Sequence, residues 1–300
     1  MHCGGTHERS DRAIRRICFV RLQPPKLQTR LNFMLIPIGD DDRRLSGPAF
    51  VTVGLVVANL LSFFLWQGAG ANDVAMYGWT VIPAEITSGV DLLQTQYVDA
   101  AGRNVPIPQA PGPSPVYLTV LSAMFMHGGY AHLFGNLLYL WIFGDNVEHR
   151  LGGSKFFGFY LFCGIIATLI QVALVPDGVI PNLGASGAIA GVLGAYIVFF
   201  PKNRVHALFV YAIVSVPAIV AIGLWIVLQF FNGWGAIMAT ESLGGIAYGA
   251  HVGGFLTGAG VAGLVRAFDS GDPSQRKASS PAPSSTATTQ AFGSGGELYR

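Results

Sequence analysis

Charged residues are scarce in this chain of 300 residues: Asp, Glu, Lys and Arg make up 11% of it, against about a quarter of an ordinary soluble domain. Hydrophobic residues make up 51%. This composition excludes an ordinary soluble domain and predicts an integral membrane protein surrounded by a lipid bilayer. The formal net charge of +2 gives no sign of the basic surface that nucleic acids require, so we expect no nucleic-acid partner.

Cysteine is also rare. Cys3, Cys18 and Cys163 are too few and too scattered to form a disulfide framework or a thiolate metal site, and they suggest no redox role. The N-terminus lacks the short apolar core and the small-residue cleavage site of a secretory signal. We therefore expect the first membrane span to direct insertion.

Six apolar stretches follow one another along the chain. They cover residues 49–67, 117–143, 156–175, 185–200, 206–231 and 244–265. Because about 20 residues of helix cross the ~30 Å hydrocarbon core of a bilayer, these stretches predict an all-α membrane protein with six transmembrane helices. A long connection of about fifty residues separates the first two, and loops of that length are usually functional or disordered.

Basic residues indicate how the chain is oriented. Of the 18 Lys and Arg residues, 17 lie in the N-terminal arm, in the loops after spans two and four, and in the C-terminal tail. By the positive-inside rule, both termini are predicted to be cytoplasmic and the long loop extracytoplasmic. The predicted location is the plasma (cytoplasmic) membrane of the cell, with the chain crossing it several times.

The chain is predicted to have three regions. Residues 1–48 form an Arg-rich cytoplasmic arm, residues 49–267 the membrane domain, and residues 268–300 a cytoplasmic tail rich in Ser, Pro, Ala, Thr and Gly. A tail of this composition has too few apolar residues to fold and is expected to be disordered. Because Met34 is a second candidate translation start, we expect residues 1–33 to come from an over-long gene model.

Ser186 places a hydroxyl group at the start of the apolar, glycine-rich fourth span. Pro181, Asn182 and Gly184 predict a turn that leads into a helix, whose unpaired N–H groups and positive dipole end would favour a developing oxyanion. The alternative is that Ser186 only caps or softens a membrane helix.

Other polar side chains fall within the predicted spans: His127, His132 and Asn136 in the second, and His251 in the sixth. Polar groups inside a bilayer are costly, so each is a functional hypothesis, although a membrane histidine taken alone more often bonds to a neighbouring helix, and Asn136 could do the same. His132 and Asn136 are four residues apart and share a helix face. His127 either lines a cavity or ends the loop. A metal site built from the three histidines lacks a carboxylate partner and is not expected.

Glycines suggest which spans meet. Gly187 and Gly191 in the fourth span, and Gly254 and Gly258 in the sixth, have the spacing that lets membrane helices approach backbone to backbone, although they could serve packing alone. Close approach would let the serine hydroxyl of one span reach the histidine of the other. Residues 185–200 form a helix of only about 24 Å, so its outer end should lie in a recessed, water-filled cavity.

These groups predict acyl-transfer chemistry. His251 would take the proton of Ser186, and the serine oxygen would attack a peptide carbonyl. The oxyanion would be held by the backbone N–H of Ser186 and the side chains of His132 and Asn136. No acidic residue lies near either motif within the spans, so we expect a dyad rather than a triad.

The combination resembles the rhomboid family of intramembrane serine proteases, over about residues 34–267. The family's His-x-x-x-Asn appears at His132, its Gly-x-Ser-Gly begins at Gly184, and its Ala-His-x-x-Gly begins at Ala250. The resemblance implies a six-helix endopeptidase that cleaves transmembrane segments of other proteins, needs no cofactor or metal, and admits substrates sideways between helices. It does not indicate the oligomeric state.

The chain departs from the family in two places. Many members have Trp-Arg shortly before the His-rich helix, where this chain reads Pro-Val-Tyr-Leu-Thr-Val, and some stack a tyrosine on the catalytic histidine where Ala190 stands.

The sequence leaves two other functions to compare with proteolysis. One is a catalytically silent relative that binds membrane proteins, which the intact serine and histidine disfavour. The other is a small-solute carrier, for which no inverted repeat is visible.

Overall fold

The computed structural model describes residues 36–41, 47–100, 103–209, 211–238 and 247–271. The helices are α2 (Phe50–Leu61, continued by a π-helical turn at Ser62–Trp66), α3 (Asp73–Gly78), α4 (Pro83–Ser88), α5 (Thr119–Ser122), α6 (Tyr130–Leu151), α7 (Gly153–Leu174), α8 (Ser186–Phe199), α9 (Ala218–Met238) and α10 (Tyr248–Gly271). The strands are β1 (Ile36–Asp40), β2 (Gln96–Ala100), β3 (Arg103–Ile107), β4 (Arg204–Phe209) and β5 (Ala212–Pro217).

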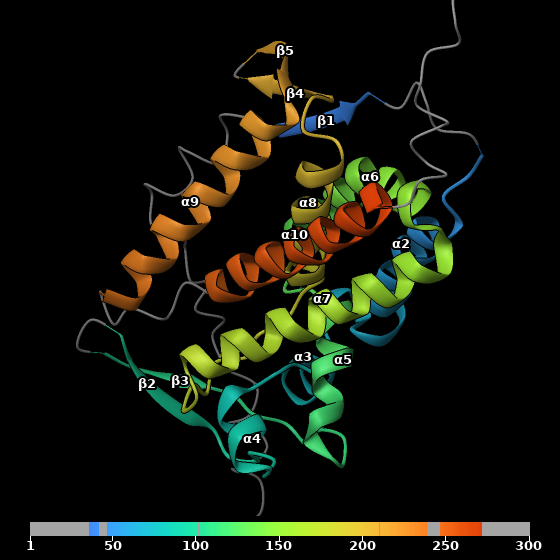
Figure 1. The fold of residues 1–300 in the computed structure, drawn as a ribbon. Coiled ribbons are helices and arrows are strands. Elements are labelled where there is room, and N and C mark those ends of the chain that lie inside the picture. Colours follow the sequence, from blue (N-terminus) through green and yellow to red (C-terminus); the bar gives the residue numbers. More distant parts are fainter. Residues whose placement is uncertain (1–35, 42–46, 101–102, 210, 239–246, 272–300) are drawn as a thin grey trace, which may run out of the picture.

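Helix α8 is the centre of the helical bundle (Figure 1). It packs against α6, α7, α9 and α10, and every residue from Gly187 to Tyr196 is buried. Small residues on several sides of α8, among them Gly187, Gly191 and Gly194, let neighbouring helices approach it closely. Its central position brings its first residue, Ser186, among several neighbouring helices.

Helix α9 packs far less tightly. Ala218 and Ile222, near its start, are buried, whereas Leu224, Val227 and Phe230 are about half exposed. In Figure 1, α9 stands at the edge of the bundle and diverges from the other long helices. One face of α9 is therefore turned toward the bundle, and the opposite face carries exposed apolar side chains suited to lipid.

The second predicted span is broken. Short helical turns end at Phe125, Met126 is extended, and α6 begins at Tyr130 after Gly129, whose φ of +152° is unfavourable for other residues. Because glycine adopts this conformation without strain, the break costs little stability. The apolar run continues across it, so the hydropathy of the sequence does not show the break. His127 consequently lies in the break rather than on a helix.

The predicted fifth span begins too early, because residues 204–217 form the antiparallel hairpin of β4 and β5. In β4, Val205 and Ala207 are fully buried while Arg204 is exposed, an alternation with the period of a strand. Strand β1 pairs antiparallel with β4 and completes a three-stranded sheet. The fold is mostly helical, as predicted, but these strands were not predicted.

The two ends of the bundle differ (Figure 1). The sheet β1-β4-β5 lies at one end, and α3, α4 and the hairpin of β2 and β3, all from the long loop, lie at the other. Arg150, Arg204 and Arg266 lie at or beside the end that carries the sheet. We call this end of the bundle the basic face. This separation follows the charge asymmetry of the sequence.

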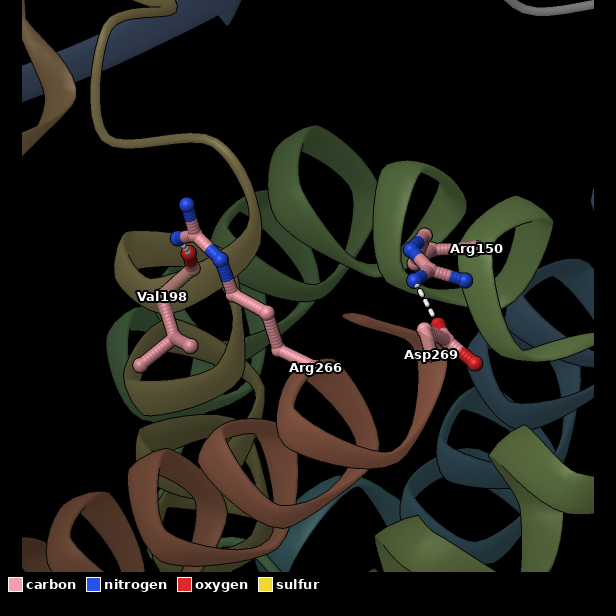
Figure 2. Close-up of polar contacts among 4 residues, drawn as sticks. All are labelled: Arg150, Val198, Arg266 and Asp269. Carbon is pink, nitrogen blue, oxygen red and sulfur yellow. Dashed lines mark hydrogen bonds and ion pairs between the residues drawn. The ribbon is translucent and has the colours of Figure 1, made fainter. Parts of the chain in front are cut away.

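Helix α10 is fastened at the basic face by two arginines (Figure 2). Arg266 donates from Nη1 to the carbonyl oxygen of Val198, 2.9 Å away, in the last turn of α8, where helix carbonyls lack partners. Arg150 of α6 pairs with Asp269. Helix α10 continues to Gly271, past the predicted domain end at residue 267. The remainder of the predicted disordered tail, and residues 1–33, lie outside the described residues.

Of the helices in the described residues, α7 alone is long and apolar enough to cross a membrane by itself, with 22 residues. Shorter apolar helices cover Phe50–Trp66, Val116–Phe125, Ser186–Phe199 and Ala218–Phe231. The number of spans is therefore still a prediction.

Candidate active site

Ser186 is the first residue of α8. The residue before it, Ala185, occupies the N-cap position, and no side chain caps the helix. Ser186 is therefore not the N-cap that the simpler interpretation requires. Gly184, which introduces the turn, has a φ of +121°, a conformation that favours glycine. The turn leaves the serine hydroxyl free to face another helix.

That hydroxyl faces α10. The Oγ atom of Ser186 lies 2.8 Å from Nε2 of His251, a hydrogen-bond distance between residues 65 positions apart. On the other side of the ring, Nδ1 lies 2.7 Å from Oε1 of Gln229 in α9. Because an amide oxygen only accepts hydrogen bonds, Nδ1 carries the proton and Nε2 accepts from the serine. This is the tautomer that a general base needs.

Two aromatic rings flank the imidazole. The ring of Trp225 lies 5.9 Å from that of His251 at an angle of 37°, and the ring of Tyr248 lies 6.5 Å away, nearly perpendicular. Ala190, where some rhomboids carry a tyrosine, is fully buried inside the bundle. The ring of His251 is thus oriented by α9 and by its own helix. Sequence reasoning missed Gln229, Trp225 and Tyr248.

Glycines bring α8 and α10 together, as predicted. A Cβ atom on Gly254 would lie 2.1 Å from the carbonyl oxygen of Gly187, and one on Gly258 would lie 1.9 Å from that of Gly191. No side chain fits in such contacts. The close approach of the two backbones sets the distance between the serine and the histidine at their outer ends.

His132 and Asn136, on α6, lie beside the turn before the serine. A Cβ atom on Gly184 would lie 2.7 Å from Nε2 of His132 and 3.6 Å from Nδ2 of Asn136. The backbone N–H of Gly128 donates to Nδ1 of His132 over 3.3 Å, so Nε2 carries the proton and points toward the turn. The side-chain nitrogen of Asn136 is buried without a partner among the described residues. Two N–H donors thus converge near Ser186.

His127, in the break before α6, packs its ring against His132. Its side chain is fully buried, and its ring lies 5.2 Å from that of His132. Its backbone is held on both sides by Gln67, which donates to its carbonyl oxygen and accepts from its N–H, each over 2.9 Å. The position of the His127 ring is therefore fixed by the end of the first helix. His127 is not among the residues that line the cavity beside Ser186, so both roles that the sequence left open stay predictions.

A small cavity adjoins the serine. It has a volume of about 30 Å³, room for a water molecule, and its lining includes Ser186, Gly184, Thr168, Gln171 and Asn182. The cavity lies between α7, α8 and α10 and has polar groups on several sides. The hydroxyl of Ser186 thus has an imidazole on one side and a polar cavity on another, and two side-chain N–H donors lie beside Gly184, two residues before it.

Comparison with known proteins agrees with this arrangement. Residues 115–268 match the model of the Rhomboid domain. The chain belongs to the Rhomboid family. The matched residues contain the serine, both histidines that face it and the asparagine, and the family implies a helical membrane fold.

Named relatives give further detail. The chain is similar to "Rhomboid protein 1, mitochondrial" of Saccharomyces cerevisiae, 33% identical over 145 residues, which are 47% of this chain and 40% of the yeast protein. It is 39% identical over 85 residues to "Rhomboid protease GluP" of Bacillus subtilis, covering 28% of this chain and 16% of that one. It is 31% identical over 210 residues to "Presenilin-associated rhomboid-like protein, mitochondrial" of Rattus norvegicus, covering 68% and 48%. The chain thus spans less than half the length of these relatives.

The predicted plasma-membrane location is contradicted by these relatives. The yeast, cattle and rat proteins are all named as mitochondrial. The positive-inside pattern defines which face of a membrane carries the basic loops, and it carries no information about which membrane that is. The sequence argument was wrong in extending an orientation to a location.

Proposed function

We propose that this rhomboid is an intramembrane serine endopeptidase. The observation that carries the proposal is the 2.8 Å contact between Ser186 Oγ and His251 Nε2. His251 accepts the serine proton as the oxygen attacks a peptide carbonyl carbon, and it then donates that proton to the leaving amine. Water, deprotonated by the same histidine, hydrolyses the acyl-enzyme. The printed name of the Bacillus relative as a rhomboid protease supports this chemistry.

The oxyanion of each tetrahedral intermediate is held by the backbone N–H of Ser186, His132 Nε2–H and Asn136 Nδ2–H. The last of these has no partner among the described residues, so a substrate oxygen satisfies a buried donor. Donors fixed in place before the reaction begins stabilise developing charge without reorganisation.

The substrates we propose are transmembrane segments of other proteins. The helical parts of the six apolar stretches cross the bilayer, and a substrate segment enters sideways from the lipid. Its small or helix-breaking residues unwind so that an extended strand reaches Ser186. The volume beside the serine, about 30 Å³, is too small for a helix and supports a narrow, extended substrate.

The test uses purified full-length protein in detergent and a model transmembrane substrate. Wild type is expected to cleave the substrate and to be labelled at Ser186 by a fluorophosphonate, whereas Ser186→Ala and His251→Ala do neither. Thr257→Val serves as control, because the Thr257 hydroxyl bonds only to the Gly253 carbonyl of its own helix, 2.7 Å away. Wild-type protein that binds the substrate but neither cleaves it nor takes the label would instead identify a silent membrane-protein-binding relative.

A further inference from the structure

Gln229 is an amide in an otherwise apolar setting. From Ala218 to Phe231, α9 has no other polar side chain except the indole of Trp225. An amide facing apolar surroundings without a partner costs on the order of 1 to 3 kcal/mol, so its partner is informative. That partner is the ring nitrogen of His251, at 2.7 Å.

Trp225 and Gln229 are four residues apart and so lie on one face of α9. Both contact His251, one by its ring and the other by its amide oxygen. Val227, between them, points elsewhere and is 49% exposed. The helix at the edge of the bundle thus presents its only amide in this stretch to the general base.

We propose that Gln229 is a positioning residue that completes a Ser-His-Gln triad with Ser186 and His251; this rests on the proposed protease function. Its Oε1 accepts the Nδ1 proton of His251, which fixes the ring plane and leaves the Nε2 lone pair directed at the serine. The role is that of the acid in a triad, taken here by a neutral amide.

A neutral amide suits this location. Helices α7, α8 and α9 contain no Asp or Glu, and among the described residues the ionisable groups facing His251 are Tyr248 of its own helix and His132 of α6. A carboxylate at position 229 would have to be desolvated against lipid. An amide gives the same hydrogen-bond direction without that cost, but it stabilises the imidazolium less, so we expect its loss to cost about tenfold in rate, the value of one hydrogen bond.

The experiment compares two substitutions at one position in the full-length protein. Gln229→Met keeps the length of the unbranched side chain and removes the amide; Gln229→Glu keeps an acceptor oxygen. We measure the rate of fluorophosphonate labelling, the kcat and KM for a transmembrane substrate, and the unfolding temperature. Val227→Leu, on the exposed face, is the matched control.

We expect Gln229→Met to label and turn over about tenfold more slowly with KM within twofold of wild type, and Gln229→Glu to stay within about threefold of wild type. A merely structural role would give equal losses in both variants, and that result overturns the proposal. Labelling of Gln229→Met within twofold of wild type overturns it as well. If wild type itself takes no label, the proposed protease function fails instead.

A second measurement needs no substitution at position 229. In protein labelled with ¹⁵N-histidine, the signal of His251 is identified by its absence from His251→Asn. The proposal requires that the neutral ring carry its proton on Nδ1. A proton on Nε2 overturns it, whether or not the protein cleaves any substrate.

Discussion

Asn136 illustrates how single side chains are prepared for a reaction. Its side chain is 8% exposed, and Nδ2 has no acceptor among the described residues. A buried donor of this kind usually lowers stability and is retained where a ligand completes it. The neighbouring Gly184 leaves room for such a ligand, because any side chain there would meet the ring of His132.

Replacing Asn136 by Ala is therefore expected to lower kcat by about 10² while leaving substrate binding nearly unchanged, since the lost donor acts mainly on the oxyanion. Steady-state kinetics with a transmembrane substrate separates kcat from KM. The unfolding temperature should not fall, because no described hydrogen bond of the Asn136 nitrogen is lost. A large rise in KM with unaltered kcat would place Asn136 in substrate binding and not in the oxyanion site.

Glu85 is a second buried polar residue, in the loop at the end of the bundle opposite the basic face. Its side chain is 3% exposed, and Oε1 accepts the N–H of Leu92 over 2.8 Å. Burial, together with the nearby carboxylate of Asp91, raises the pKa of Glu85 from its ordinary value of 4.5 to about 7. Asp91 in turn accepts the N–H of Gly112 over 3.0 Å. The two carboxyl groups thus hold distant parts of the loop together.

The raised pKa predicts a dependence of stability on pH. Between pH 4.5 and 7 the folded protein holds a proton on Glu85 that the unfolded chain has lost, so the contribution of Glu85 to stability falls as the pH rises through this window. Glu85→Gln should therefore raise the unfolding temperature at pH 8 and leave it unchanged at pH 5. Asp177→Asn, at an exposed site, is the control. Equal effects of Glu85→Gln at both pH values would contradict the assignment.

Two helices can pack backbone against backbone where glycines leave the contact without side chains. Helices α8 and α10 touch through Gly187, Gly191, Gly254 and Gly258, so backbone packs on backbone. Two other glycines of α10 have no such role: a Cβ atom on Gly260 or Gly263 would meet nothing within 4 Å. Position along one helix therefore decides whether a methyl group is tolerated.

Gly258→Ala should push the two helices apart and carry His251 away from Ser186. We expect a loss of 1 to 3 kcal/mol or more in stability, about the cost of overpacking, and a loss of fluorophosphonate labelling larger than the loss of folded protein. The control is Gly260→Ala, two residues further along the same helix, which should keep both. Wild-type labelling in Gly258→Ala would show that the helix contact does not set the catalytic distance.

At the scale of the whole molecule, the sequence indicated which side chains lie close together better than it indicated the helices and strands that carry them. Ser186, His251 and the glycines could be predicted because polar groups and small residues in apolar spans have few structural uses. Gln229 obeys the same rule and could have been found by it, but it belongs to no motif and lies 22 residues from its partner.

The helices and strands themselves were harder to predict, for a physical reason. An apolar run such as residues 206–217 has too few polar positions to show its period, so helix and strand cannot be told apart until a partner strand is known. That partner, β1, comes from residues 36–40, some 170 positions earlier. The break near Gly129 is hidden in the same way, because a helix and a broken helix have the same hydropathy.

Strand β1 joins the N-terminal arm to the bundle. Asp40 accepts hydrogen bonds from the hydroxyl of Tyr196 in α8 and from Nδ2 of Asn146 in α6, the latter over 2.9 Å. The hydroxyl of Tyr196 also accepts a bond from Asn203. The arm therefore reaches the central helix ten residues after Ser186, at the opposite end of the same helix.

Truncation tests this connection. A chain that begins at Met34 keeps β1 and should have the unfolding temperature of the full chain. A chain that begins at residue 42 loses the β1–β4 pairing and leaves the buried Tyr196 without its carboxylate acceptor, so its unfolding temperature should fall by several degrees, as expected for a loss of about 1 to 3 kcal/mol. Asp40→Asn in the chain that begins at Met34 isolates the carboxylate and should give a smaller fall. If both truncations unfold like the full chain, β1 does not stabilise the bundle.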